Sequence, residues 1–122
     1  MSIKMKGGTE MNQFIVYLDE MVEKLKAEEE ELRTSDRKDE SNFVKIKINI
    51  CEISKSVYQV VAKQADAESL KDAYLDKMSA ISSNWTKAYE KAKENQDVEK
   101  IVIEETKFEM LEQIKSKLLE LM

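Results

Sequence analysis

Residues 41–64, SNFVKIKINICEISKSVYQVVAKQ, are the most apolar stretch of the chain and decide its fold class. The first half alternates apolar and polar side chains as a β-strand does, with Val44, Ile46 and Ile48 separated by lysines. From Ile50 onward the apolar residues instead recur three and four positions apart, which is the spacing of a helix. A lone strand would need a partner, and no turn residues or second strand are available to supply one. The stretch therefore predicts a helix.

The remainder of the chain extends this helical prediction, because it lacks the residues that interrupt helices. There is no proline, and the two glycines lie together at Gly7 and Gly8. We expect residues 1–8 to form a flexible arm. Amphipathic spacing then predicts helices over about 10–33, 41–64, 67–95 and 98–121. Their matched lengths and short connections predict an all-α, antiparallel four-helix bundle with up-down-up-down topology, which an oligomer of helical hairpins could also build.

Three short segments separate the four predicted helices. Residues 34–40 contain no apolar side chain and predict a linker. Asp66 predicts an N-cap at the point where the apolar stripe shifts by roughly 160° around the helix axis. Asn95 predicts a left-handed C-cap, and Asp97 predicts the N-cap of the last helix. A continuous rod running through Asp66, and dimerising, is the alternative that this pattern leaves open.

Composition limits the chemistry that the chain can support. The 122 residues fit one bundle domain, at 9–122, and their net charge of −5 argues against a nucleic-acid partner. There is no histidine, which excludes Ser-His-Asp and Cys-His catalysis within this chain. No apolar run approaches the roughly 18 residues that span a bilayer. With no signal pattern at the N-terminus, we expect a cytoplasmic protein without a membrane partner, and export without a classical signal peptide is the alternative.

Two sets of residues could carry chemistry, and each has a structural interpretation beside the functional one. Cys51 is the single cysteine, and the apolar neighbours on its helix face predict a buried, unreactive thiol. Glu105, Glu109 and Glu112 share one helix face, where a carboxylate site for a hard cation competes with a solvated surface. The solvated surface is the commoner outcome for a glutamate-rich helix. We therefore predict no catalytic residue, no cofactor and no metal site.

Aromatic residues form a stripe along the third predicted helix. Tyr74, Trp85 and Tyr89 lie at helical spacing and could make a binding platform. Because aliphatic side chains continue the same stripe, we expect core instead.

Apolar residues cover about two-thirds of the helical wheel of the second predicted helix, more than a four-helix core requires. This surplus predicts a second buried surface, and we place it on the face that carries Val44, Ile48, Cys51 and Tyr58. The sequence thus predicts a small helical protein, not an enzyme, that acts through protein–protein contact or self-assembly. A second copy of the chain, as a homodimer or a larger oligomer, is the first candidate partner. A bundle that binds a small molecule or a metal is a further alternative.

A short N-terminal segment followed by an acidic amphipathic helix resembles the small helical WXG100-type substrates of type VII secretion. The resemblance covers about the first third of the chain and implies a secreted or secretion-associated helical factor that acts as a dimeric hairpin. Those proteins carry Trp-x-Gly in the hairpin turn, whereas Trp85 is followed here by Thr86 and Lys87 inside a predicted helix.

Overall fold

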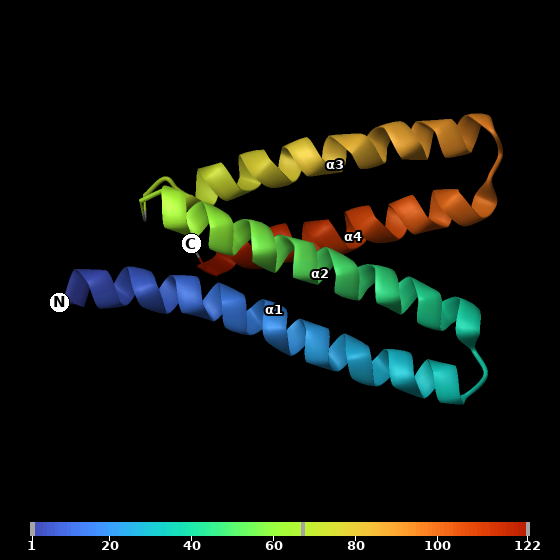
Figure 1. The fold of residues 1–122 in the computed structure, drawn as a ribbon, viewed down its shortest axis with the longest axis horizontal. Helices are drawn as coiled ribbons and strands as arrows, with labels where there is room; N and C mark the ends of the chain where they lie inside the picture. Colours follow the sequence, from blue (N-terminus) through green and yellow to red (C-terminus); the bar gives the residue numbers. More distant parts are fainter. Residues whose placement is uncertain (1, 67, 122) are drawn as a thin grey trace.

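Four helices make up the computed structural model, which describes the backbone of residues 2–66 and 68–121 and the side chains of 13–66 and 68–121. They are α1 (Ser2–Thr34), α2 (Lys38–Gln64), α3 (Leu70–Glu94) and α4 (Val98–Leu121), as Figure 1 shows. No strand occurs among the described residues, so the strand-like alternation at the start of α2 lies on a helix. The all-α prediction is confirmed. Within the described part of the chain, no helix combines the length and the apolar character needed to cross a membrane.

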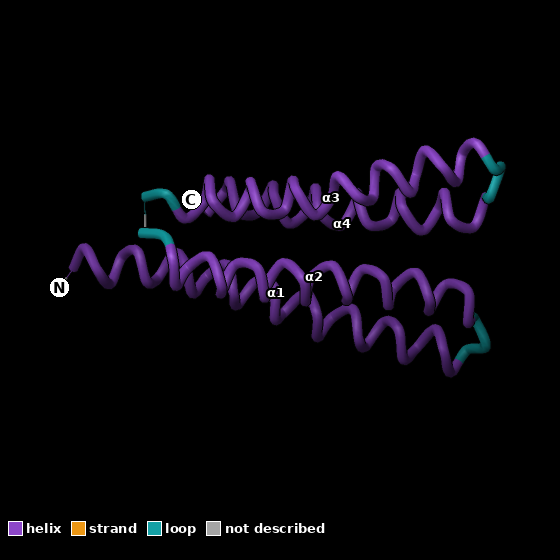
Figure 2. The backbone as a smooth tube through the Cα atoms, turned by 45° about the horizontal axis from the view of Figure 1, so that its top comes forward, coloured by secondary structure: helices purple, strands orange, loops and turns teal. Residues whose placement is uncertain are grey.

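Successive helices run in opposite directions, which confirms the antiparallel up-down-up-down bundle (Figure 1). One hairpin consists of α1 and α2, and the other consists of α3 and α4 (Figure 2). Both α2 and α4 pack against all three other helices, whereas the backbones of α1 and α3 stay apart within the described residues and the two helices touch through long side chains such as Phe14 and Tyr74. The two central helices are therefore α2 and α4. This position gives the wide apolar arc of α2 enough neighbours within the chain itself.

An aromatic cluster joins three helices in the core. Phe14 from α1, Tyr58 from α2 and Tyr74 from α3 are each at most 1% exposed. The Phe14 ring centroid lies 4.7 Å from that of Tyr58 and 5.6 Å from that of Tyr74, and the two tyrosine rings are 5.6 Å apart. Tilted and edge-to-face arrangements of this kind add to the free energy gained by burial.

Both hairpins close with the same type of turn, in which one residue takes a left-handed conformation. Asp36 (φ 61°) is this residue between α1 and α2, and Gln96 (φ 54°) is its equivalent between α3 and α4. In each turn an amide bonds back to a carbonyl five residues earlier: Arg37 N–H to Leu32 O and Asp97 N–H to Ala92 O, both at 2.9 Å. This is the Schellman arrangement, which satisfies the carbonyls that a helix end would otherwise leave free. We call the two turns, residues 35–37 and 95–97, the hairpin tips.

The capping predictions at the second tip were partly right. Asp97 caps α4, since its Oδ1 accepts a hydrogen bond from the Lys100 N–H at 3.2 Å. Asn95 is not the left-handed residue, because its φ is −87° and the chain continues one residue further before it reverses. The left-handed position falls on Gln96, where the Schellman hydrogen bonds require it.

The break between α2 and α3 lies where the apolar stripe changes phase, which rules out the continuous rod. Asp66 holds this connection, because its Oδ1 accepts hydrogen bonds from the Ser69 amide at 3.0 Å and the Ser69 hydroxyl at 2.6 Å. These bonds lower the pKa of the Asp66 carboxyl. Asp66 thus bonds to the turn that precedes α3, but it is not the predicted N-cap, because α3 begins at Leu70 and its N-cap is Ser69. Residue 67, where we expected the helix to start, lies outside the described residues.

Two helix starts differ from the sequence expectation. The helix expected from about residue 10 begins at Ser2, so the backbone of the expected flexible arm belongs to α1. Gly7 and Gly8 cost about 1 kcal/mol each in a helix, but neither prevents one from continuing. The linker expected over 34–40 is reduced to the tip at 35–37, because α2 begins at Lys38. A polar segment can be helical when a turn and an ion pair hold it, and Arg37 pairs here with Glu40.

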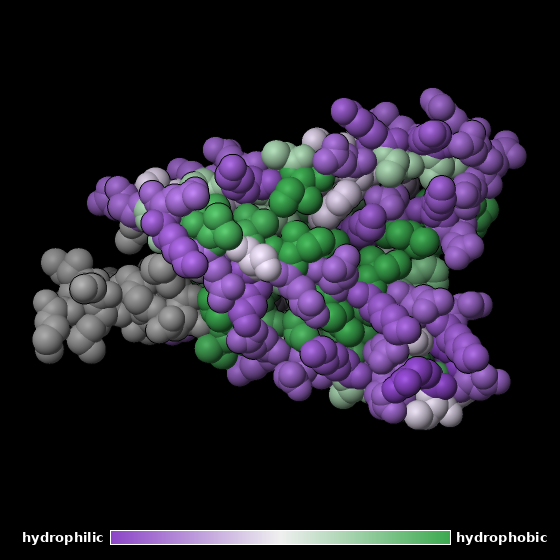
Figure 3. All heavy atoms as spheres, in the orientation of Figure 1, coloured by the Kyte–Doolittle hydropathy of each residue, from purple (hydrophilic) through white to green (hydrophobic). Residues whose placement is uncertain are grey.

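The two hairpins diverge toward their tips. In Figures 1 and 2 they lie closest at the end that holds the 65–69 connection, and they separate toward the opposite end. The space-filling view in Figure 3 shows a notch between the two arms at the tip end, with hydrophobic side chains inside it. Part of the apolar surface that remains open on this bundle therefore lies near the tips.

Candidate functional site

The predicted interaction face on α2 is largely buried within the bundle. Val44, Cys51 and Tyr58 are 4%, 0% and 1% exposed, and Ile48 is half-buried. Tyr58 packs at a tilt against Phe14 of α1 and edge-to-face against Tyr74 of α3, as described above. The prediction placed a binding surface here because this face is apolar, but the apolar character serves packing within the chain.

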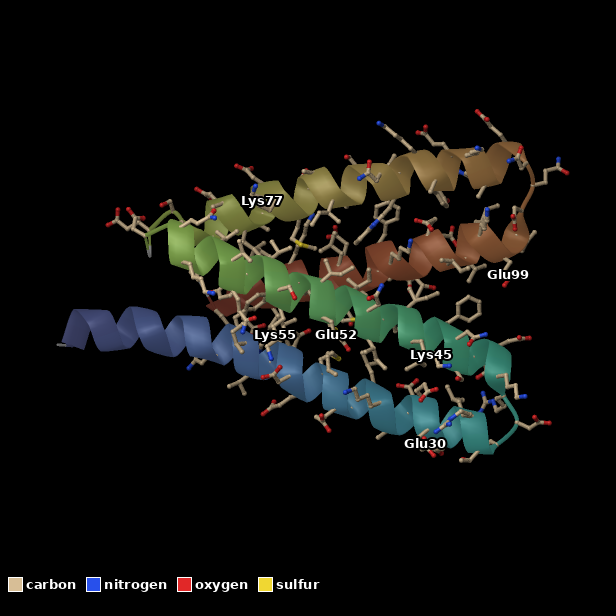
Figure 4. All side chains as sticks on the ribbon, viewed as in Figure 1. Glu30, Lys45, Glu52, Lys55, Lys77 and Glu99 are labelled. Carbon is tan, nitrogen blue, oxygen red and sulfur yellow. The ribbon has the colours of Figure 1, made fainter. Side chains whose placement is uncertain are left out.

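Polar contacts along the edges of the α1–α2 interface support this assignment. Lys55 Nζ lies 2.7 Å from Asp19 Oδ1, and Figure 4 shows the Lys55 side chain between the two helices. Near the tip, the Ser41 hydroxyl donates to Glu29 Oε1 at 3.2 Å, and Lys45 Nζ lies 3.7 Å from the same carboxylate oxygen. These contacts fix the register of the first hairpin.

Cys51 lies inside this interface and is not accessible. Burial, and secondarily the charge of Glu52, raises the pKa of its thiol to about 11. A thiol that stays protonated at neutral pH is a poor nucleophile and a poor metal ligand. The prediction of a buried cysteine is confirmed.

The aromatic stripe of α3 belongs mainly to the core, as expected. Tyr74 is fully buried and Trp85 is 9% exposed, and Trp85 packs edge-to-face on Phe108 of α4 at 5.8 Å. Tyr89 lies at the edge of the same interface, where its hydroxyl donates to Glu105 Oε2 at 3.1 Å. Trp85 and Tyr89 hold α3 against α4, and Tyr74 holds it against α1 and α2.

The carboxylates of α4 are not gathered into a metal site. Glu105 accepts the Tyr89 hydrogen bond, and Glu112 lies 3.7 Å from Lys115 Nζ. Glu109 lines a wide hollow of about 790 Å³ beside α4 and α1, and six of the nine residues around that hollow are polar or charged. Among the described residues, no group of three Cys, Asp or Glu side chains could hold a metal ion.

A smaller cleft, most of whose lining residues are apolar, lies between the first turns of α2 and α4. It has a volume of about 400 Å³. Five of its eight lining residues are apolar and the other three are polar: Phe43, Ile46, Val98, Val102 and Ile103, with Asp39, Asn42 and Glu99. We call it the tip cleft. Val98 is 71% exposed and is the most exposed large hydrophobic residue of the described chain.

The charged residues that line the tip cleft are both acidic. Asp39 lies in the first turn of α2 and Glu99 in the first turn of α4. Figure 4 labels Glu99, near the tip of the second hairpin. Carboxylates in these positions are stabilised by the helix dipoles. Within the described part of the chain neither carboxylate has an ion-pair partner at 4.0 Å or less.

Polar side chains that are wholly or partly buried lie behind the α4 wall of the tip cleft. Glu104 is 6% exposed, and its carboxylate lies 3.0 Å from Lys107 Nζ, which in turn lies 5.8 Å from the centre of the Trp85 ring. The buried Thr106 hydroxyl donates to the Val102 carbonyl at 2.7 Å. The buried polar groups behind this wall therefore have partners, as buried polar groups in folded proteins usually do.

The sequence contains two residues that point to this cleft, Val98 and Val102, but our prediction of the interaction face did not take them into account. Val98 and Val102 stand one helical turn apart but are exposed, unlike the buried apolar residues of α4, which are Met110, Leu111, Ile114 and Leu118. Apolar residues off the core face are candidates for contact with something else. Their pairing with Phe43 and Ile46 depends on how the hairpins pack.

Comparison of the chain with models of protein families, with curated proteins and with solved structures gave no match, and the resemblance to WXG100-type proteins therefore gains no support.

Proposed function

We propose that this protein works by binding another protein at the tip cleft and that it catalyses no reaction. The observation that carries the proposal is the gathering of Val98 and Val102, 71% and 36% exposed, with Phe43 and Ile46 around one cleft. Other exposed large hydrophobic residues, such as Val16 on α1, do not line this cleft. A rimmed apolar cleft is the surface feature most typical of a binding site.

Several observations support a binding role over catalysis. The sequence has no histidine, and Cys51 is buried with a raised pKa. The exposed carboxylates and lysines can serve as general acids or bases, but the two charged side chains of the tip cleft, Asp39 and Glu99, are both carboxylates and stand on opposite walls. Sites that perform acid–base chemistry usually place an acid and a base close together in different environments.

A capture experiment with matched variants tests the proposal. The wild type, a cleft variant with Val98→Ser and Val102→Ser, and a control with Val60→Ser are immobilised and exposed to lysate of the source organism. Val60 is 52% exposed on α2 and lies away from the cleft lining, so the control removes a similar apolar area. Proteins retained by wild type and control but lost by the cleft variant are then purified. We expect calorimetry to show binding weakened about tenfold or more by the cleft variant.

Equal binding by the cleft variant and the control would contradict the proposal. Circular dichroism of all three proteins confirms that the substitutions leave the fold intact. Because both positions are partly or largely exposed, we expect changes in unfolding free energy of about 0.5 kcal/mol or less for each.

Self-association is the second candidate. The projecting Val98 side chain lies beside the tip cleft, so in a two-fold dimer Val98 of each copy could enter the cleft of the other. A two-fold interface between identical copies requires such a self-complementary surface. Sedimentation across a concentration series tests it. A mass that rises above 14.2 kDa for the wild type but not for the cleft variant would support it.

A further inference from the structure

We infer that the tip cleft receives one face of an amphipathic helix from a different protein, with two or three apolar side chains flanked by Lys or Arg. This inference rests on the proposed function and adds the chemistry of the partner. It is drawn from the size of the cleft, the course of its walls and the sign of its charges.

The dimensions of the cleft fit side chains from about two turns of a helix. On α2 the lining runs from Asp39 to Ile46, a rise of about 10 Å at 1.5 Å per residue. A volume of about 400 Å³ is near the lower end of the range of ligand pockets and holds a few apolar side chains rather than a whole helix. The occupant would therefore lie across the mouth and insert the side chains of one face.

The charges of the lining select a cationic partner over a second copy. Asp39 and Glu99 stand on opposite walls and are the two charged residues around the cleft. A copy of this chain placed symmetrically would bring the same two carboxylates to the contact, and like charges across an interface disfavour it. Lys or Arg residues beside the inserted apolar side chains would instead complement both walls.

The net negative charge of the chain also favours a cationic partner. At −5 it attracts cationic segments over distances of about a Debye length, which increases the rate of encounter. Because Asp39 and Glu99 lie at an exposed rim, their pairing contributes more to partner choice and association rate than to affinity. We therefore expect the preference for a cationic partner to weaken as salt is added.

The test uses synthetic helical peptides of about four turns with leucines on one face. One peptide carries lysines beside the leucines, a second carries glutamates there, and a third has the lysine composition in a scrambled order. We expect fluorescence anisotropy to show that the wild type binds the lysine peptide about tenfold or more tightly than either of the others. The variant with Asp39→Asn and Glu99→Gln should reduce the preference for lysine over glutamate to about threefold or less.

A control variant with Asp76→Asn and Glu90→Gln removes two exposed carboxylates of α3 and changes the net charge equally. It should keep the full preference for the lysine peptide, because neither residue lines the cleft. Loss of the preference in this control as well would show a general charge effect and would overturn the inference.

The remaining outcomes separate this inference from the proposed function. If both helical peptides bind equally well and only the cleft variant Val98→Ser with Val102→Ser abolishes binding, the charge argument fails while the binding cleft stands. If the wild type forms a dimer that the same cleft variant dissociates, the occupant is a second copy and the inference is overturned. If no peptide binds and no captured protein depends on the cleft, both proposals fail.

Discussion

Phe14 is the residue on which most of the aromatic core depends. Its ring contacts Tyr58 of α2 and Tyr74 of α3, so one side chain of α1 reaches into both hairpins. Truncating a fully buried aromatic side chain that packs against other aromatic rings lowers the stability of the folded state more than most substitutions do.

Replacing Phe14 by Ala should therefore lower the free energy of unfolding by about 3–5 kcal/mol. Val16→Ala is the matched control on the same helix, because Val16 is 50% exposed, and it should change stability by about 0.5 kcal/mol or less. Urea unfolding followed by circular dichroism measures both. Similar effects for the two variants would show that the aromatic cluster is not packed as described.

Cys51 makes stability depend on pH in the alkaline range. Its pKa is about 11 in the folded protein against an ordinary value of 9.0, so the unfolded chain loses the proton first as the pH rises. The stabilisation is complete below about pH 9 and is lost as the pH rises toward about 11. Unfolding free energy should therefore fall more between about pH 8 and pH 10.5 in the wild type than in a Cys51→Ala variant.

Comparing these two proteins isolates the thiol from the tyrosines. Burial, the largest cause, also raises the pKa of Tyr74, to about 12, and it acts in both proteins, whereas the smaller effect of the Cys51 charge on Tyr74 is present in the wild type alone. If the two stability profiles run parallel over this pH range, the thiol is not buried in the folded protein.

At each hairpin tip, one residue with a side chain adopts a left-handed backbone conformation, which is strained. Gln96 holds a left-handed conformation with a Cβ atom, which costs roughly 1–2 kcal/mol relative to a right-handed one. The Schellman hydrogen bonds around it compensate for that cost, and glycine would not incur it.

Gln96→Gly should accordingly raise the unfolding free energy by roughly 1 kcal/mol, after allowance for the greater freedom of glycine in the unfolded chain. Asn95→Gly is the control, because Asn95 has a φ of −87° and gains nothing from glycine. We expect that neighbour to lose a few tenths of a kcal/mol. Thermal unfolding of the two variants gives the comparison, and a gain at Asn95 instead would place the left-handed residue there.

The sequence predicted the number and order of the helices better than their ends. The phase change at Asp66 and the N-cap at Asp97 could be read directly, because caps and periodicity are local properties. The start of α1 at Ser2 was missed, since Gly7 and Gly8 weaken a helix without ending it. At the second tip the left-handed residue was placed one position too early, because Asn95 has the better propensity but Gln96 has the right place in the hydrogen-bond pattern.

In the whole molecule, the packing of the helices determines which apolar residues of α2 are buried and which stay open, and a helical wheel does not contain this information. The wheel of α2 shows which side chains are apolar, and the structure shows that Val44 and Cys51 are buried in the bundle while Phe43 and Ile46 open onto the tip cleft. A sequence does not state the angle between two hairpins, so it could not separate a packed face from an open one. The predicted interaction face was misplaced for that reason.

The central position of α2 predicts that the two hairpins unfold together. Trp85, the single tryptophan, reports on the α3–α4 hairpin, whereas far-ultraviolet circular dichroism reports on all four helices. Because α2 packs against both helices of the other hairpin, the two signals should follow one urea transition with a common midpoint. Separate midpoints would show that the hairpins are independent units that merely touch.

The distance between the tips and the 65–69 connection has a practical consequence. That connection lies at the opposite end of the bundle from the tip cleft (Figure 1). Glu68 is exposed there, and the chain's own thiol is buried, so a Glu68→Cys variant would offer one reactive handle. Coupled through that handle to a sensor surface, the molecules would stand upright and present their clefts to solution in a single orientation, ready for partner screening.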